Sequence, residues 1–169
     1  SYYLEYGKER MLSRKRVLIP EMLKKSQIIT AGFHSNPYIS EDLGWNRGWD
    51  VFYDSMEDQV GDLFPYIKAE KINKKVNVWL SSYKMLGGNK PFFLWVHYMD
   101  VHEPYIPAPS YLESVDSSIH LMEEEMFNLF KTVLLNRDIS DRSTLDLLKK
   151  LYYAHIIEVD QRIKDFFAI

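Results

Sequence analysis

The stretch PFFLWVHYMDVHEPYIPAP, residues Pro91 to Pro109, joins an apolar run to a polar, proline-rich segment. Its first part, Phe92 to Val96, is short, aromatic and without alternation, which is typical of a central strand covered on both faces. Pro104 and Pro107 cannot donate to a ladder, so the strand must end before them. Four titratable side chains follow the strand: His97, Asp100, His102 and Glu103. Because ligands of open α/β sheets collect at the carboxyl ends of strands, we expect a site here.

The residues before this strand predict further elements of an α/β fold. The segment from about Pro20 to Lys25 is expected to be a helix with proline in its first turn, and Ile28 to Phe33 is expected to be a short strand. An amphipathic pattern within Asp62 to Leu86 predicts a helix that Gly87 and Gly88 end. A helix followed by a buried strand is the α/β pattern, and we expect the two strands to be adjacent.

Between the first strand and the long helix lies a segment rich in aromatic residues and glycine. Asn36 before Pro37 predicts a loop, since the residue before proline avoids the α region. Gly44 and Gly48 are expected to permit positive φ or a close backbone approach. The aromatic side chains of this loop are those of Trp45, Trp49, Phe52 and Tyr53. They either wall a substrate cleft or belong to the core, which is the commoner role of clustered aromatic residues.

Downstream of the polar cluster, the pattern predicts two helices. Ser117 to Leu135 is expected to be a helix with an acidic middle. Thr144 to Phe167 is expected to be a long helix, with Ser143 or Thr144 as its cap. The apolar face of the long helix is predicted to use Leu148, Leu151, Tyr152, Val159, Ile163 and Phe166.

Length and composition limit the class of protein. The 169 residues, 46% of them hydrophobic, are enough for a single domain over 1–169 with a sizeable core. A net charge of -3 argues against nucleic acid or an anionic membrane as the partner. No apolar run approaches the roughly 20 residues of a membrane span, so we expect a soluble chain with no membrane-spanning segment. The absence of cysteine excludes disulfides and Cys-based metal sites, but it does not indicate whether the cellular compartment is oxidising or reducing.

Three stretches, in order, resemble the sulfatase family of the alkaline phosphatase superfamily. PFFLWVHYMDVHEPY, from Pro91 to Tyr105, resembles the family element PFFL-x-V-H-x-x-D-x-H-x-P-Y. IPEMLKKSQIITAGFHSNPYISEDLGWNRGWDVFYD, from Ile19 to Asp54, resembles its helix, T-A-x-F-x-S-N-P and G-x-x-x-G-[FW]-D-x-F passage. LYYAHIIEVDQRIKDFF, from Leu151 to Phe167, resembles its Y-x-x-x-I-x-x-V-D-x-x-I helix. The resemblance implies part of an alkaline-phosphatase-like sheet flanked by helices on both faces.

The chain also departs from the family. It contains neither C-x-P-S-R nor S-x-P-S-R, the motif whose Cys or Ser becomes the formylglycine nucleophile, and no Asp-His pair of the kind that closes the metal site. We therefore expect the chain to be the central portion of such an enzyme. The divalent metal of the intact enzyme, expected to be Ca²⁺, and the formylglycine would both be held outside this chain. Alone, the chain is expected to be inactive and to bind no divalent metal tightly. Self-association or pairing with missing chain segments is expected.

The resemblance also suggests roles for individual residues. His102 matches the histidine that contacts a sulfate oxygen, so it would donate a hydrogen bond to the anion and stabilise charge on the leaving oxygen. Asp100 matches an acidic position two residues earlier and would orient the loop or His102. His97, Asp100, His34 and Asn36 are the candidate substrate-binding residues. The residues alone leave His97, His102 and His34 open to a purely structural role at strand ends or in loops.

Three functions follow as hypotheses. The first is hydrolysis of small-molecule sulfate esters by a metal-dependent sulfatase. The second is hydrolysis or transfer of phosphate esters by a relative in the same superfamily, such as a phosphodiester or phosphonate hydrolase or a phosphoglycerol-type transferase. The third is a binding module that keeps the scaffold without catalysis. Fold analogy alone cannot choose among them.

Overall fold

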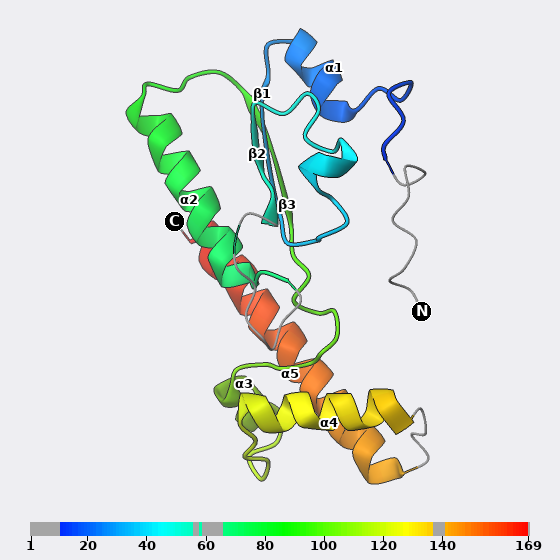
Figure 1. Cartoon of the computed structure of the whole chain (residues 1–169). Helices are drawn as coiled ribbons and strands as arrows, with labels where there is room; N and C mark the ends of the chain where they lie inside the picture. Colours follow the sequence, from blue (N-terminus) through cyan, green and yellow to red (C-terminus); the bar gives the residue numbers. More distant parts are fainter. Residues whose placement is uncertain (1–10, 56–57, 59–65, 137–140, 169) are drawn as a thin grey trace. The chain divides into compact units, whose positions relative to one another are not determined.

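The computed structural model describes residues 11–55, 58, 66–136 and 141–168 (Figure 1). The chain divides into two compact units. The first unit comprises Ser1–Gln59 with Lys74–Tyr98, and the second comprises Val60–Asn73 with Met99–Ile169. The architecture is α/β, with a three-stranded parallel sheet and 51% helix. The expectation of a single domain over 1–169 stays a prediction.

The first unit contains the parallel sheet. Its strands are β1 (Ile29–His34), β2 (Val51–Tyr53) and β3 (Phe92–His97), in the order β2-β1-β3. Ile29 pairs with Phe92 and His34 with His97, so β1 and β3 are in register along their whole length. The predicted adjacency of the first strand and the Phe92 to Val96 strand is therefore confirmed.

The position of β3 in the sheet differs from the prediction. Five of the six residues of β1 are buried, whereas β3 has an exposed first residue and five half-buried ones. Within the described part of the chain, β3 pairs only with β1 and lies at the edge of the sheet. The prediction of a central strand was wrong because an uninterrupted aromatic run indicates apolar neighbours on both faces but not a strand on each side. The central strand is β1.

Different side chains cover the two faces of the sheet. On one face Phe33 packs against Trp79 of α2 (Ala69–Met85), with ring centroids 6.2 Å apart. On the other face Trp49 stacks on Phe93 and Trp95, at 5.9 and 6.0 Å. Gly32 allows this, because a Cβ at that position would lie 3.2 Å from the Trp49 ring. The second face also carries α1 (Ile19–Lys25), which confirms the helix predicted there.

The second unit is helical. It contains the start of α2, then α3 (Pro109–Val115), α4 (Glu123–Asn136) and α5 (Arg142–Phe167). Its fully buried apolar core consists of Ile106, Leu112, Met126, Leu151 and Ala154. None of the described helices is long and apolar enough to cross a membrane.

Several boundaries differ from the predicted ones. α4 begins at Glu123, which places the acidic triplet in its first turn, where negative charge complements the helix dipole. The cap of α5 is Asp141, whose carboxylate accepts hydrogen bonds from the amides of Ser143 and Thr144. Tyr152, predicted on the buried face of α5, is exposed. β2, α3 and the 3-10 helix η2 (Glu41–Leu43) were not predicted.

Candidate functional site

Two of the predicted site residues end neighbouring strands. His34 is the last residue of β1 and His97 the last of β3, and the two are register partners. Asp54 follows β2 directly and is buried. Because the strands are parallel, their carboxyl ends share one edge of the sheet. This carboxyl edge therefore carries two histidines and a carboxylate from three consecutive strands of the sheet.

His34 is fully buried and has no hydrogen-bond partner among the described residues at either ring nitrogen. Its ring centroid lies 5.1 Å from that of Phe52 and 6.2 Å from that of Trp95. Burial lowers the pKa of His34 to about 4, although the Asp54 carboxylate acts in the opposite direction. The ring is therefore neutral at pH 7 and offers one donor and one acceptor.

His97 is half-buried, and its Nδ1 likewise has no partner among the described residues. Burial lowers the pKa of His97 as well. The strand end beside it is held by Ser35, whose backbone N–H and hydroxyl both donate to the His97 carbonyl, at 3.2 and 3.3 Å. Asn36 uses its Oδ1 to accept a hydrogen bond from the Tyr38 amide at 2.9 Å, which shapes the loop after β1.

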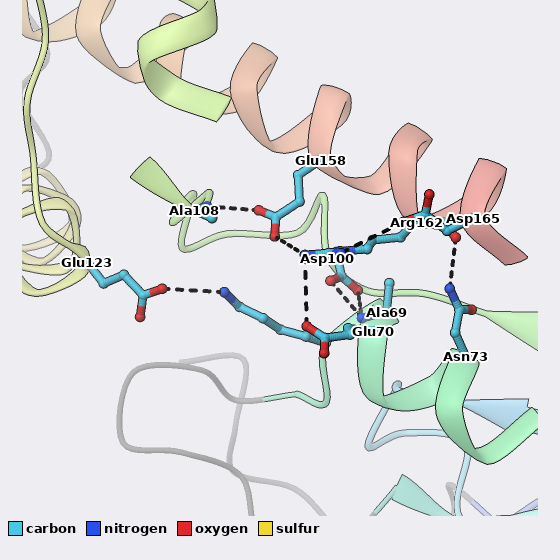
Figure 2. A network of polar contacts seen from close by, with 10 residues as sticks. Ala69, Glu70, Asn73, Asp100, Ala108, Glu123, Glu158, Arg162 and Asp165 are labelled. Atoms are coloured by element: carbon cyan, nitrogen blue, oxygen red, sulfur yellow. Dashed lines mark hydrogen bonds and ion pairs between the residues drawn. The ribbon is translucent and has the colours of Figure 1, made fainter. Parts of the chain in front are cut away.

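The other two predicted site residues belong to the second unit, and Asp100 is the more buried. Only 5% of Asp100 is exposed, and both its carboxylate oxygens accept from the Ala69 N–H at 2.8 Å (Figure 2). The hydroxyl of Tyr66 donates to the carbonyls of Asp100 and His102, at 3.4 and 3.1 Å. Burial raises the pKa of Asp100 to about 6. The hydrogen bonds of Asp100 therefore connect the loop on which His102 lies to Ala69, the first residue of α2.

His102 is exposed, with 47% of its side chain accessible. Its Nδ1 lies 2.8 Å from the Glu103 carbonyl oxygen and 3.4 Å from the Glu103 carboxylate. A carbonyl can only accept, so the first contact requires the proton on Nδ1. Nε2 of the neutral ring is then an acceptor, and it donates only when the ring is doubly protonated. The geometry leaves the imidazole accessible to a solute from solvent.

A polar network on α5 supports the same part of the second unit (Figure 2). Glu158, which is buried, accepts from the Ala108 N–H at 2.9 Å and lies 3.7 Å from the Arg162 guanidinium. Arg162 also lies 3.8 Å from Glu70, in the first turn of α2. The carbonyl of Arg162 accepts from the Asn73 side chain at 2.8 Å. Sequence reasoning missed Glu158 and Arg162, because an i, i+4 pair of opposite charges usually marks a solvated helix face.

The sequence-predicted residues thus fall into two groups. His34, Asn36 and His97 lie in the first unit, where the register brings the two histidines to neighbouring positions. Asp100 and His102 lie in the second unit, on one tightly bonded loop. Ser35 and Asp54 were not singled out from the sequence as site residues. The place of Ser35 just after the predicted strand was a usable signal, whereas Asp54 follows β2, which was not predicted.

An apolar pocket of about 300 Å³ opens on the face of the sheet that Trp49 covers. Its lining residues are Val17, Leu18, Ile19, Pro20, Ile39, Trp45, Trp49, Phe52, Phe93 and Trp95. Three members of the predicted aromatic set therefore line it. The fourth, Tyr53, packs instead on Phe33 of the opposite face, with ring centroids 6.3 Å apart.

The described residues contain no group of three or more metal-ligating side chains placed to hold an ion. No protein-family model matches the chain, and neither a curated protein nor a solved structure matches it.

Proposed function

We propose that the chain forms the central part of a sulfatase-like hydrolase that acts on small-molecule sulfate esters. The observation that carries the proposal is the register of β1 with β3, since these strands bear the T-A-G-F-H-S-N-P and P-F-F-L-W-V-H elements. Two separate motifs of the resemblance therefore end at one edge of a parallel sheet. Ligands of open α/β sheets bind outside such an edge.

His102 is the residue proposed to contact the ester. Its ring is accessible, and its Nδ1–H is directed to the Glu103 carbonyl. The doubly protonated ring would donate from Nε2 to an anionic oxygen, and charge that develops there in the transition state would strengthen this bond. Asp100 would act as a positioning residue, because its bonds to Ala69 hold the loop on which His102 lies.

His34 and His97 would contribute differently from His102. Burial lowers the pKa of each ring, so both are neutral near pH 7. Each neutral ring would offer a single hydrogen bond at the carboxyl edge of the sheet in the first unit. The described residues do not fit a metal centre, so the metal and the formylglycine of such an enzyme would be held by other parts of the protein.

Hydrolysis assays on the complete protein that contains this chain test the proposal. The substrates are p-nitrophenyl sulfate, p-nitrophenyl phosphate and bis(p-nitrophenyl) phosphate. Fastest turnover of the sulfate ester is expected. A faster reaction with either phosphate ester would favour the phosphoryl-transfer relatives, and no turnover of any of the three would favour a binding module.

A further inference from the structure

We propose that the pocket of the first unit is a binding site for a neutral, planar aromatic compound of one or two rings. The proposal concerns only this pocket and does not depend on ester hydrolysis. It rests on the lining, the charge and the size of the pocket.

The lining combines flat aromatic surface with aliphatic walls. Trp49 is nearly parallel to Phe93 and Trp95, with interplanar angles of 21° and 27°. Aliphatic side chains at Val17, Ile19 and Ile39 complete the wall. A planar ring entering this space would find both offset-stacked and edge contacts, which aromatic pairs prefer.

The charge of the lining selects the class of ligand. None of the described residues that line the pocket is ionisable. His34 contacts the rings of Phe52 and Trp95, and it is neutral at pH 7 because burial lowers its pKa to about 4. A cation would stack on the rings but would find no carboxylate in the lining to offset its desolvation. An anion would find no cation there. A neutral ligand fits this lining.

The size of the pocket limits the ligand to a small one. A volume of about 300 Å³ is at the lower end of the range for small-molecule sites. One or two fused rings fill such a space, whereas a larger polycyclic compound would extend into solvent. The mouth is accessible, because Val17 and Ile19 are 64% and 62% exposed.

The four tryptophans of the chain supply the test and its internal control. Trp45, Trp49 and Trp95 line the pocket, whereas Trp79 packs on the opposite face of the sheet against Phe33. The ¹⁵N-labelled chain is titrated with unlabelled indole, and the four indole N–H signals are followed by NMR. We expect saturable shifts of the three pocket tryptophans, with a dissociation constant of about 1 mM or tighter, and no shift of Trp79.

Two variants and one competing ligand sharpen the result. Val17→Trp at the mouth and Ile39→Trp in the wall should each weaken indole binding at least about tenfold, a difference of about 1.4 kcal/mol. Val78→Trp is the matched control, since Val78 is 68% exposed and does not line the pocket, and its affinity should stay within about twofold of wild type. Benzyltrimethylammonium should bind more weakly than indole.

The same titration can overturn the proposal. An absence of saturable shifts, or equal shifts of all four tryptophans, would contradict a site in this pocket. Equal weakening by Val17→Trp and Val78→Trp would do the same. Tighter binding of the ammonium compound would refute the assignment of a neutral ligand. Thermal unfolding of each variant checks that it folds. If Ile39→Trp fails to fold, Val17→Trp still tests the proposal, because Val17 is exposed.

Discussion

At the scale of single residues, the histidines of this chain differ by environment rather than by neighbouring sequence. His34 and His155 are buried, and burial lowers the pKa of each to about 4, whereas His102 and His120 are exposed. A buried neutral imidazole must gain a proton when the protein unfolds below its ordinary pKa. The buried histidines therefore make stability depend on pH, and the exposed ones are available to solutes.

His34→Phe should reduce the sensitivity of the first unit to acid. The folded-state pKa of His34 is below its unfolded value, so the unfolded chain binds more protons between pH 6.5 and 4, and stability falls as pH falls through that window. When the pH falls from 7 to 4.5, the free energy of unfolding should decrease by about 2–3 kcal/mol more for the wild type than for His34→Phe. Urea unfolding at the two pH values measures this difference. His120→Phe, at an exposed histidine, is the control and should follow the wild type.

Asp100→Asn should show the opposite dependence on pH. The folded-state pKa of Asp100, about 6, is above its ordinary value, so the stability that it contributes is present at low pH and is lost as pH rises through 6. The free energy of unfolding of the variant, relative to that of the wild type, should increase by about 3 kcal/mol between pH 3.5 and 7. Chemical unfolding at both pH values tests this, with Asp160→Asn, at an exposed aspartate of α5, as control. If the difference in unfolding free energy between Asp100→Asn and wild type is the same at both pH values, the Asp100 carboxylate is not desolvated.

At the scale of elements, the sequence predicted most of what lies in long or strongly patterned segments. α1, β1, β3 and the body of α2 and α5 were expected at or near their observed positions. The three-residue β2 was missed because its pairing with β1 is a tertiary contact that no local pattern encodes. The burial of Asp100 was missed for the same reason, since its partner Ala69 is 31 residues away.

For the candidate site, the sequence predicted the positions of the histidines along the chain but not their surroundings. Placing His34 and His97 at strand ends followed from the apolar runs before them, and the adjacency of the strands brought them into register. The burial of His34 depends on side chains from other segments, such as Phe52, and the loop that carries His102 is held by the hydroxyl of Tyr66. These contacts cannot be derived from spacing along the chain.

Two glycines with similar backbone conformation should respond differently to substitution. Gly48 and Gly87 have φ of 82° and 72°. A Cβ at Gly48 would lie 2.5 Å from the backbone nitrogen of Glu21 in α1, whereas one at Gly87 meets nothing within 4 Å. Gly87→Ala should therefore cost about 1 kcal/mol for the left-handed conformation. Gly48→Ala should cost at least about twice that, because it adds a steric overlap. Equal losses in thermal unfolding would contradict the close approach of α1.

At the scale of the whole molecule, apolar surface is exposed where α2 ends and β3 begins. Met85 and Leu86 are 86% and 87% exposed, and Phe92 begins the edge strand β3. Exposed apolar side chains beside a strand edge favour association. We expect sedimentation velocity to show oligomers at micromolar concentration, reduced by Leu86→Lys. Leu135→Lys, at a similarly exposed leucine of α4, should leave association unchanged. A monomeric wild-type chain would refute the expectation.

We propose that this chain supplies an anion-contacting histidine to an ester hydrolase. The most direct measurement is kcat/KM for p-nitrophenyl sulfate in the complete protein that contains the chain, compared among wild type, His102→Ala and His120→Ala. His120 is a matched control, because it is also exposed and also lies beside a glutamate, with its Nδ1 3.3 Å from Glu113. His102→Ala should lower kcat/KM by roughly 10² to 10³, the effect of losing one donor to a developing anion, with unfolding temperature and His120→Ala activity unchanged. Full activity of His102→Ala, or an equal loss in both variants, would refute the proposed contact of His102 with the ester.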